Sequence, residues 1–546
     1  MSQAKTYTGL PLGGLWVLLV LVVFHAIASL RAWGWDSVDF ADTYWRISPD
    51  LWVLLTVASL LCLKFGFRWY FGLAFAVALA WIPLYRVPYV VFPEMFGKTF
   101  VLTEEVGQVG GLWIALFDGG PDGVSIWTVV LVAGIGLLTL VILYLLWRTL
   151  GRQLEKAAYS LCLLGIAAAV LATSFAEKSR DPGRESRLFS RSMYASTLQQ
   201  LNFFIGRASL EPRIKYAHDQ VSRAPQDLGR LKRADLILVF VESYGRSLLA
   251  HDRYGPVMRQ ILADARATLE AAGHGAISCW IESPVTGSQS QAAHASFISG
   301  IPIRSYRDHE MLMNYDARML THILGDLGYH CVNAQPKLEI QWPESHDVLG
   351  FHEDLFGVHT PYRADGGPIY HWAAAPDQYP LALAIEKFMK PSDKPVFLQL
   401  IAGISHAPYS LIPPYIEDWQ AALDPKAYQP VKTYPFTFLD YHRGKGVEDA
   451  YIATLNYTFE MLAGFVSALP RPAIVMILGD HQAPRTGSIS PAVTDYAVPF
   501  HIMSNRNELL DPIRTAGFVE GMVPGGKKVP PMHEFLHEFL RAYHRK

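Results

Sequence analysis

Four apolar runs in the second half of the chain are each followed by side chains that can do metal-binding, acid–base or nucleophilic chemistry. Glu242 follows LILVFV, His406 follows VFLQLIAGIS, and Asp480 and His481 follow AIVMILG. Ser290 comes a few residues after AISCWI, in the hydroxyl-rich stretch VTGSQSQAAHASFISG. Two carboxylates, an imidazole and a hydroxyl form a shell that suits a divalent metal. A metal-bound serine loses its proton more readily and becomes a nucleophile near neutral pH.

The elements that must position these side chains are the strands and helices of an α/β domain. Continuous apolar strands separated by helical patterns indicate a sheet covered on both faces, with ligands at the carboxyl ends of its strands. A single carboxylate after a strand is usually a cap or turn residue, so the convergence of four strand ends is what indicates a site. The predicted strands are 235–241, 276–281, 329–334, 396–402, 473–478 and 499–504, and the predicted helices include 314–327 and 447–468.

The motifs FVESYG, SQAAHASFISGIP, ISHAPY and LGDHQAP together resemble the alkaline phosphatase and sulfatase superfamily. Within it, the chain is similar to the membrane-anchored phosphoethanolamine, phosphoglycerol and lipoteichoic acid transferases. In that family the nucleophile begins a helix, and a small residue and a glycine follow nine and ten positions later. Ser290, Ser299 and Gly300 fit this spacing. Thr286 and Ser288 do not fit, and we expect them to be turn or capping residues.

The resemblance implies a metal centre that also contains the nucleophile. The implied ions are one or two divalent cations, Zn²⁺ or Mn²⁺, and mixed oxygen and nitrogen ligands suit either. Ser290 is the implied nucleophile, at a helix N-terminus that favours a bound phosphate. The implied ligands are Glu242, Ser290, Asp480 and His481.

Three further residues are predicted on the substrate side. His406 resembles the histidine of the transferases that holds the phosphate or protonates the leaving oxygen. Trp342, in IQWPES, resembles a tryptophan that lines the head-group pocket in some relatives. His294 is also predicted to contact substrate.

The chain departs from the family patterns at two places. Ser290 is followed by Gln-Ala-Ala-His, not by the x-Pro-x-Arg that sulfatases need for formylglycine, which argues against sulfate-ester hydrolysis. The second histidine that phosphoethanolamine transferases carry after Asp-His is missing, as are their several disulfides. The missing second histidine and the missing disulfides favour phosphoglycerol-type or another head-group transfer.

Five apolar runs in the first half predict membrane spans. The run 125–147 has 23 residues without a charge, long enough to cross about 30 Å of hydrocarbon. Basic residues gather in the loops after the second and fourth runs, which places these loops and the N-terminus in the cytoplasm and the second half of the chain outside it. The predicted spans are 13–30, 48–63, 69–85, 125–147 and 157–175.

The predicted organisation is a transmembrane domain (1–176), a juxtamembrane helical linker (177–230) and an extracytoplasmic catalytic domain (231–546). The chain carries 47 basic and 49 acidic residues, so a nucleic-acid partner is not expected. The spans lack the facing ionisable groups of an ion path, which argues against a transporter. Cys279 and Cys331 lie in the second half, and the sequence leaves their pairing open.

The segment HEFLHEFL near the C-terminus matches the H-E-x-x-H motif of zinc proteases. The longer form of that motif needs Gly and His where the chain has Leu540 and Tyr543. An amphipathic terminal helix with Phe535, Leu536 and Phe539 turned inward is the preferred interpretation.

These observations predict a multi-pass protein of the cytoplasmic (inner) membrane with about five transmembrane helices and an α/β domain of sulfatase type, a mixed sheet covered on both faces. The predicted activity moves a phospholipid head group through a phospho-Ser290 intermediate onto an envelope glycan or lipid. Its partners would be the phospholipid donor, that acceptor and the membrane. Two alternatives stay open. One is a phosphodiester or sulfate-ester hydrolase of the same superfamily, and the other is a non-catalytic envelope sensor.

Overall fold

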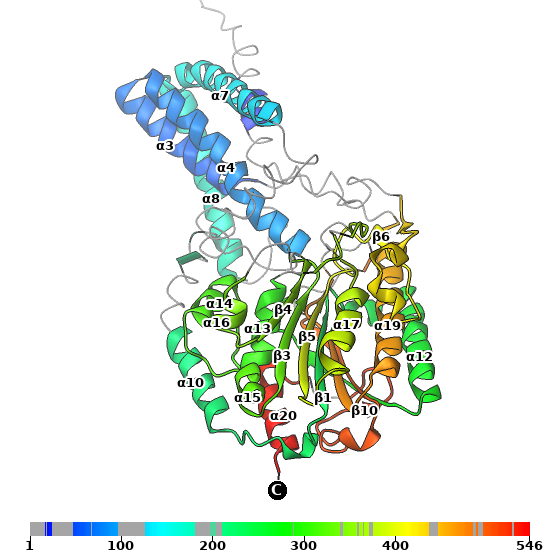
Figure 1. Cartoon of the computed structure of the whole chain (residues 1–546). Helices are drawn as coiled ribbons and strands as arrows, with labels where there is room; N and C mark the ends of the chain where they lie inside the picture. The colour runs from blue at the N-terminus through cyan, green and yellow to red at the C-terminus, as the bar shows by residue number, and fades with distance from the viewer. Residues whose placement is uncertain are drawn as a thin grey trace, which may run out of the picture. The chain divides into compact units, whose positions relative to one another are not determined.

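The computed structural model divides the chain into two compact units, residues 1–93 with 99–207, and residues 94–98 with 208–546 (Figure 1). The described residues are 17, 19–24, 47–66, 68–96, 126–180, 197, 200–201, 210–287, 289–338, 342–357, 360–363, 365–370, 375–435, 446–483, 488–489, 495–526 and 529–545.

The first unit is helical. The side chain of Ser48 caps α3 by accepting from Leu51 N at 3.3 Å, and Gly66 ends the helix with a φ of 68°. Between α4 and α7, Phe75 stacks on Trp147 with ring centroids 3.9 Å apart. The long helices are α3 (Pro49–Phe65), α4 (Trp69–Phe96), α7 (Ile126–Leu154) and α8 (Ala157–Arg180).

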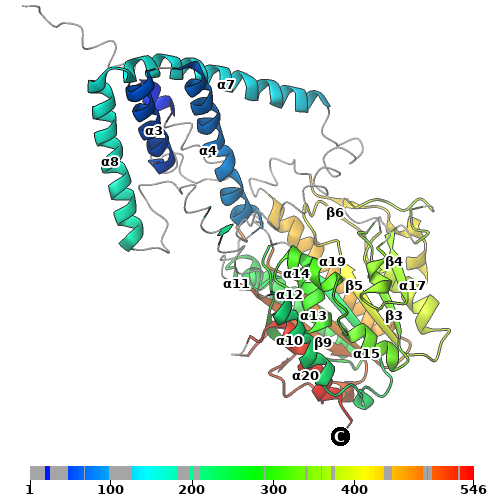
Figure 2. The same cartoon turned by 90° about the vertical axis from the view of Figure 1, so that its left-hand side faces the viewer.

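Two segments of the described residues are long and apolar enough to cross a membrane, Gly134–Leu154 and Ala157–Ala176. Most of their residues are not buried, and large apolar side chains such as Leu137 and Leu161 are exposed, as lipid contact requires. Figure 2 shows α7 running across the ends of α3, α4 and α8 that lie at the top of the picture. The predicted five-helix bundle is therefore not established. The first predicted span, 13–30, lies mostly outside the described residues.

The second unit is built on one mixed eight-stranded sheet in the order β10-β2-β9-β8-β1-β5-β3-β4. Strands β8, β1, β5, β3 and β4 are mutually parallel, whereas β9 is antiparallel to both of its neighbours, β8 and β2. The carboxyl end of β2 therefore points the same way as those of the parallel strands. The strands are β1 (Asp235–Val241), β2 (Gly275–Glu282), β3 (His330–Gln335), β4 (Glu353–Phe356), β5 (Val396–Ala402), β8 (Ala473–Gly479), β9 (Ala497–Ser504) and β10 (Val519–Glu520). A separate pair is β6 (Leu411–Ile412) with β7 (Lys432–Thr433).

Helices cover both faces of this sheet, because alternate strand residues are apolar on each side. On β1, Leu236, Leu238 and Phe240 join the core cluster with α10, α13, α15 and α20, and the residues between them join the cluster with α12 and α19. The helices are α10 (Leu210–Arg223), α11 (Arg246–Ala250), α12 (Tyr254–Ala271), α13 (Ser290–Ser299), α14 (Tyr306–Met313), α15 (Leu320–Asp326), α16 (Glu344–Asp347), α17 (Gln378–Ala384), α19 (Val447–Ala468) and α20 (Phe535–Tyr543).

The structure confirms the predicted α/β domain with a mixed sheet and helices on both faces. All six predicted strands are present, as is the helix 447–468, whereas the helix predicted over 314–327 starts only at Leu320. Within the segment predicted as a linker, α10 buries Ile214 and Val221 in the core of the second unit. That helix therefore contributes to the core of the second unit.

Cys279 and Cys331 are both buried free thiols. Cys279 lies on β2 and Cys331 on β3, with four strands between them in the sheet. At about 4.8 Å per strand this separation is far beyond the reach of a disulfide. Burial raises the pKa of both thiols to about 12, so neither is a reactive thiolate at neutral pH.

Candidate active site

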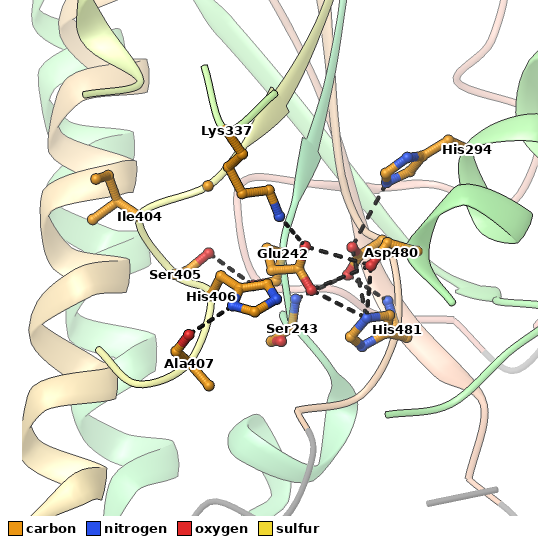
Figure 3. A network of polar contacts seen from close by, with 12 residues as sticks. Glu242, Ser243, His294, Lys337, Ile404, Ser405, His406, Ala407, Asp480 and His481 are labelled. Atoms are coloured by element: carbon orange, nitrogen blue, oxygen red, sulfur yellow. Dashed lines mark hydrogen bonds and ion pairs between the residues drawn. The ribbon is translucent and has the colours of Figure 1, made fainter. Parts of the chain in front are cut away.

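Polar side chains from five segments meet at the carboxyl edge of the sheet (Figure 3). Glu242 follows β1, Lys337 follows β3, His406 follows β5, and Asp480 and His481 follow β8. Ser290, the first residue of α13, joins them after the loop that leaves β2. Because these strands all point the same way, their ends converge and form the predicted site.

Glu242 is the fully buried carboxylate at the centre of the site. Its Oε2 lies 2.6 Å from Lys337 Nζ, and its Oε1 lies 3.2 Å from His481 Nε2. Burial alone would raise the pKa of Glu242, but Lys337, then His406 and His481, hold it well below its usual value. Glu242 is therefore an anion at neutral pH despite its burial.

Ser290 presents its hydroxyl to two of these side chains. Its Oγ lies 3.1 Å from His481 Nε2 and 3.3 Å from Glu242 Oε1. The helix that it begins ends at Ser299, and Gly300 caps it with a φ of 68°, as the spacing of the motif predicted. Gln289, just before Ser290, has a φ of 66°, which few residues other than glycine adopt. This turn directs the start of α13 at the site.

Asp480 and His481 are held by their own loop. Asp480 Oδ1 accepts from Ser243 N at 2.9 Å and from His481 N at 2.7 Å, so its other oxygen, Oδ2, is left facing the site. Nδ1 of His481 donates to the Gln482 carbonyl at 2.7 Å, and its Nε2 faces Ser290. Burial would lower the pKa of His481, but Asp480 and Glu242 outweigh it and raise the pKa to about 9.

The donor set fits a divalent metal ion. Ligand atoms of Glu242, Asp480 and His481 all lie within 4.8 Å of one another, and all three residues are buried. Among the described residues, Asp480 Oδ2 is a buried oxygen with no hydrogen-bond partner, a costly arrangement that a cation would relieve. Two carboxylates, one imidazole and a neighbouring hydroxyl are ligands that Zn²⁺ and Mn²⁺ both accept.

Hydrogen bonds from Gly403, Ile404 and Ser405 hold the start of the loop that carries His406. The buried carboxylate of Asp377 accepts from Gly403 N at 2.7 Å and from Ile404 N at 3.1 Å. Ser405 donates its hydroxyl to the Glu242 carbonyl at 2.7 Å. Nδ1 of His406 donates to the Ala407 carbonyl at 2.7 Å, and burial lowers the pKa of the ring, with Glu242 opposing this in part.

Lys337 and Asp377 are site residues that the sequence interpretation did not include. Lys337 stands two residues beyond the end of β3, so the same reasoning from strand ends would have found it. Its stem packs on Gly403, where a Cβ would come within 2.4 Å of Lys337 Cγ. Asp377 follows no strand, and nothing in its local sequence distinguishes it from a helix cap.

The other predicted substrate residues lie in different positions. His294 faces Asp480, with Nε2 3.7 Å from Oδ2 (Figure 3). Trp342 is half-buried and packs against the core cluster that includes α13 and α20. In the loop before α13, Ser283 donates to the Asp480 carbonyl at 2.5 Å, which ties this loop to the loop that carries Asp480 and His481. Ser288 lies outside the described residues.

The H-E-x-x-H segment is a packing element. Phe535, Leu536, Phe539 and Leu540 are buried in the core beside α13, as the amphipathic interpretation predicted. In the part of the chain that the structure describes, the three-residue ligand group at Glu242, Asp480 and His481 is the one found, and neither His533 nor His537 belongs to it.

No family model and no curated protein sequence matches the chain. Among solved structures it is similar to the lipoteichoic acid synthase LtaP from Listeria monocytogenes, at 16% identity over 56% of this chain and 70% of that one, with a TM-score of 0.36. It is similar to an alkaline phosphatase superfamily protein from Vibrio parahaemolyticus, at 16% identity over 50% of this chain and 60% of that one, with a TM-score of 0.32. It is also similar to the Streptococcus pyogenes phosphoglycerol transferase GacH, at 13% identity over 61% of this chain and 91% of that one, with a TM-score of 0.35.

Proposed function

We propose that the chain is a membrane-anchored, metal-dependent phosphotransferase of the alkaline phosphatase superfamily. It moves a phospholipid head group of the phosphoglycerol or phosphoethanolamine type onto an envelope glycan or lipid. The observation that carries this proposal is the position of Ser290. Its Oγ stands at a helix N-terminus, 3.1 Å from His481 Nε2 and 3.3 Å from Glu242 Oε1.

Glu242, Asp480 and His481, together with the Ser290 hydroxyl, would hold one or two divalent ions, Zn²⁺ or Mn²⁺. When bound, the metal favours the serine alkoxide and offsets negative charge on the phosphoryl oxygens. The backbone N–H groups at the start of α13 lie beside Ser290 and favour a bound anion there.

The first half-reaction forms a covalent intermediate. The Ser290 hydroxyl releases its proton to solvent, its Oγ bonds to the phosphorus of the donor phosphodiester, the bond from phosphorus to the diacylglycerol oxygen breaks, and diacylglycerol leaves as an alcohol. His406 supplies the proton for that oxygen. Burial keeps its ring neutral in the free site, and the anionic donor favours the protonated ring by Coulomb attraction once it is bound.

The second half-reaction restores the serine. An acceptor hydroxyl gives its proton to His406 and bonds to phosphorus, and the bond from phosphorus to Ser290 Oγ breaks. Throughout, Lys337 is a fixed cation next to the transferring group, with its ammonium held at Glu242 and its stem held on Gly403. Substrate contacts by Trp342 belong to this proposal as well.

The first unit fits this chemistry because the donor is a lipid. Its two apolar segments, Gly134–Leu154 and Ala157–Ala176, would anchor the chain in the cytoplasmic membrane. The basic residues at the end of the first segment and between the two segments, together with those that follow α3, favour a catalytic domain on the periplasmic or extracellular side. The multi-pass arrangement with five spans remains part of the proposal.

Peptide mass spectrometry on the full chain tests this function. The Zn²⁺- or Mn²⁺-loaded protein in detergent is incubated with mixed membrane phospholipids, beside Ser290→Ala and the matched control Thr286→Ala. Thr286 is a buried hydroxyl in the same loop. We expect a mass increment on the Ser290 peptide of the wild type and of the control, and none in Ser290→Ala.

The size of the increment would identify the head group. Release of free head group into water without an added acceptor would instead support the hydrolase alternative. An unmodified Ser290 peptide, with metal bound and every major phospholipid class present, would contradict the proposal and favour a binding role.

A further inference from the structure

Two buried polar atoms face each other beside the metal-ligand group without a hydrogen bond. Asp480 Oδ2 and His294 Nε2 are 3.7 Å apart, and neither has a hydrogen-bond partner among the described residues. The Asp480 side chain is fully buried, and 13% of the His294 side chain is exposed. Orphaned buried polar atoms cost free energy, so two of them aimed at one another indicate a function.

The position of His294 in the chain connects two parts of the site. It lies four residues after Ser290 on α13, so both side chains leave the same face of the helix. The ring packs against Phe240 of β1 with centroids 4.4 Å apart, which fixes its plane. His294 therefore lies between the helix of the nucleophile and the loop that carries Asp480, and Phe240 restricts the plane of its ring.

The geometry argues against His294 as a direct ligand of the same ion. Two ligands about 2.1 Å from one ion are at most about 4.2 Å apart. The group whose ligand atoms lie within 4.8 Å of one another contains Glu242, Asp480 and His481, but not His294. Asp480 Oδ1 already accepts two backbone N–H groups, so Oδ2 is the oxygen that faces both the ligand group and His294.

We infer that His294 is a positioning residue of the metal centre, which donates a hydrogen bond from Nε2 to Oδ2 of the metal ligand Asp480. Closing the 3.7 Å gap to a hydrogen bond of about 2.8 Å needs a shift of about 1 Å. Outer partners of this kind orient a ligating carboxylate and tune metal affinity. This inference rests on the proposed function, and it replaces the substrate contact that the sequence predicted for His294.

Zinc binding by the full chain in detergent tests the inference without any substrate. Zn²⁺ is titrated into the chelator-stripped protein against a chromophoric competitor, and the number of imidazole ligands is counted by zinc K-edge X-ray absorption. The variants are His294→Leu, which removes the donor, and His294→Gln, whose side-chain amide can donate from a similar position. His537→Leu is the control for loss of a half-buried histidine elsewhere, and thermal unfolding is measured for every variant.

We expect His294→Leu to raise the dissociation constant for zinc about 10- to 100-fold, the usual effect of losing an outer partner. His294→Gln should recover most of the affinity, His537→Leu should match the wild type, and the imidazole count should stay at one throughout. Unchanged affinity in a folded His294→Leu protein would overturn the inference. A count that falls from two in the wild type to one in the variant would overturn it too, because His294 would then be a ligand. A wild type that binds neither zinc nor manganese would refute the proposed function, and this inference with it.

Discussion

Lys337 Nζ lies 2.6 Å from Glu242 Oε2, and the stem of the same lysine lies against the backbone of Gly403. The ends of β3, β1 and β5 are thereby locked together by one side chain. The ammonium has little freedom to move, because the stem packs on Gly403 and the Asp377 carboxylate holds the backbone there. A cation fixed in this way can stabilise a phosphoryl group without first having to be ordered.

Gly403→Ala should displace Lys337 without changing any charged residue. The new Cβ would come within 2.4 Å of Lys337 Cγ, so the stem must move. With the donor that the adduct identifies, we expect kcat/KM to fall about tenfold or more in Gly403→Ala and about 10- to 100-fold in Lys337→Met. The loss in Lys337→Met follows from one charge-assisted hydrogen bond, which contributes about 1.5–3 kcal/mol. In the double variant the two losses should not add. Additive losses would show that Gly403 acts independently of Lys337.

Ser290→Thr and Ser290→Ala should distinguish a catalytic role of the Ser290 hydroxyl from a structural role of the residue in α13. Threonine keeps the nucleophile, and a helix start tolerates a β-branched residue, so adduct formation and turnover should persist within about tenfold. Alanine removes the attacking oxygen, and turnover should fall by a factor of about 10³ or more. Circular dichroism and unfolding temperature should be the same for both. Substantial turnover by Ser290→Ala would rule out a covalent route through this residue.

Asp480→Asn should remove metal binding and leave the loop intact. The amide oxygen can replace Oδ1 as acceptor for Ser243 N and His481 N, while the amide nitrogen takes the place of Oδ2. We expect zinc affinity to fall more than about 100-fold, with the unfolding temperature in chelator close to that of the wild type. Asp480→Ala should lower both the zinc affinity and the unfolding temperature, because two buried N–H groups are left without an acceptor. Equal unfolding temperatures for the two variants would contradict this role of Oδ1.

His501 should make the second unit sensitive to acid. It is fully buried on β9, where Tyr244 OH lies 3.2 Å from its Nε2 and Ser278 Oγ 2.8 Å from its Nδ1. Burial lowers the pKa of His501 from 6.5 to about 3. A folded-state pKa below that of the unfolded chain means that the unfolded state binds more protons between these values, so stability is lost as pH falls from about 6.5 towards 3.

The expected loss is on the order of 5 kcal/mol at the acid end, since one pKa unit corresponds to about 1.4 kcal/mol. His501→Gln has no proton to gain, so its free energy of unfolding should depend less on pH over this range, even if it is lower at pH 7. Denaturant unfolding in chelator at a series of pH values measures the two slopes. Parallel slopes would show that His501 does not carry the acid sensitivity.

The sheet and most of the site could be predicted because both follow from local patterns. Uninterrupted apolar runs such as 235–241 and 396–402 are the buried parallel strands, and their bounds agree with the structure. Glu242, His406, Asp480 and His481 follow such runs directly. Ser290 was singled out by the spacing to Ser299 and Gly300 that the family resemblance supplies, and the structure places the helix at Ser290–Ser299.

The parts that could not be predicted depend on contacts between distant segments. Strand β4 has four residues and β10 has two, too few for a periodic signal, and they form because β3 and β2 offer a free edge. Asp377 acts on a loop 26 residues away, at Gly403. Of the five predicted membrane spans, two coincide with segments of the described residues that are long and apolar enough to cross a membrane, and the other three stay a prediction.

Ser243 and Gln289, the neighbours of Glu242 and Ser290, both have a φ above 60°. This backbone conformation costs a residue other than glycine about 1 kcal/mol or more, so glycine at either position should make the fold more resistant to heat. The same glycine would loosen the turn that aims the adjacent catalytic group. A laboratory selection for thermal stability alone should therefore accumulate substitutions at these two positions, and the selected variants should unfold at higher temperature and turn over more slowly.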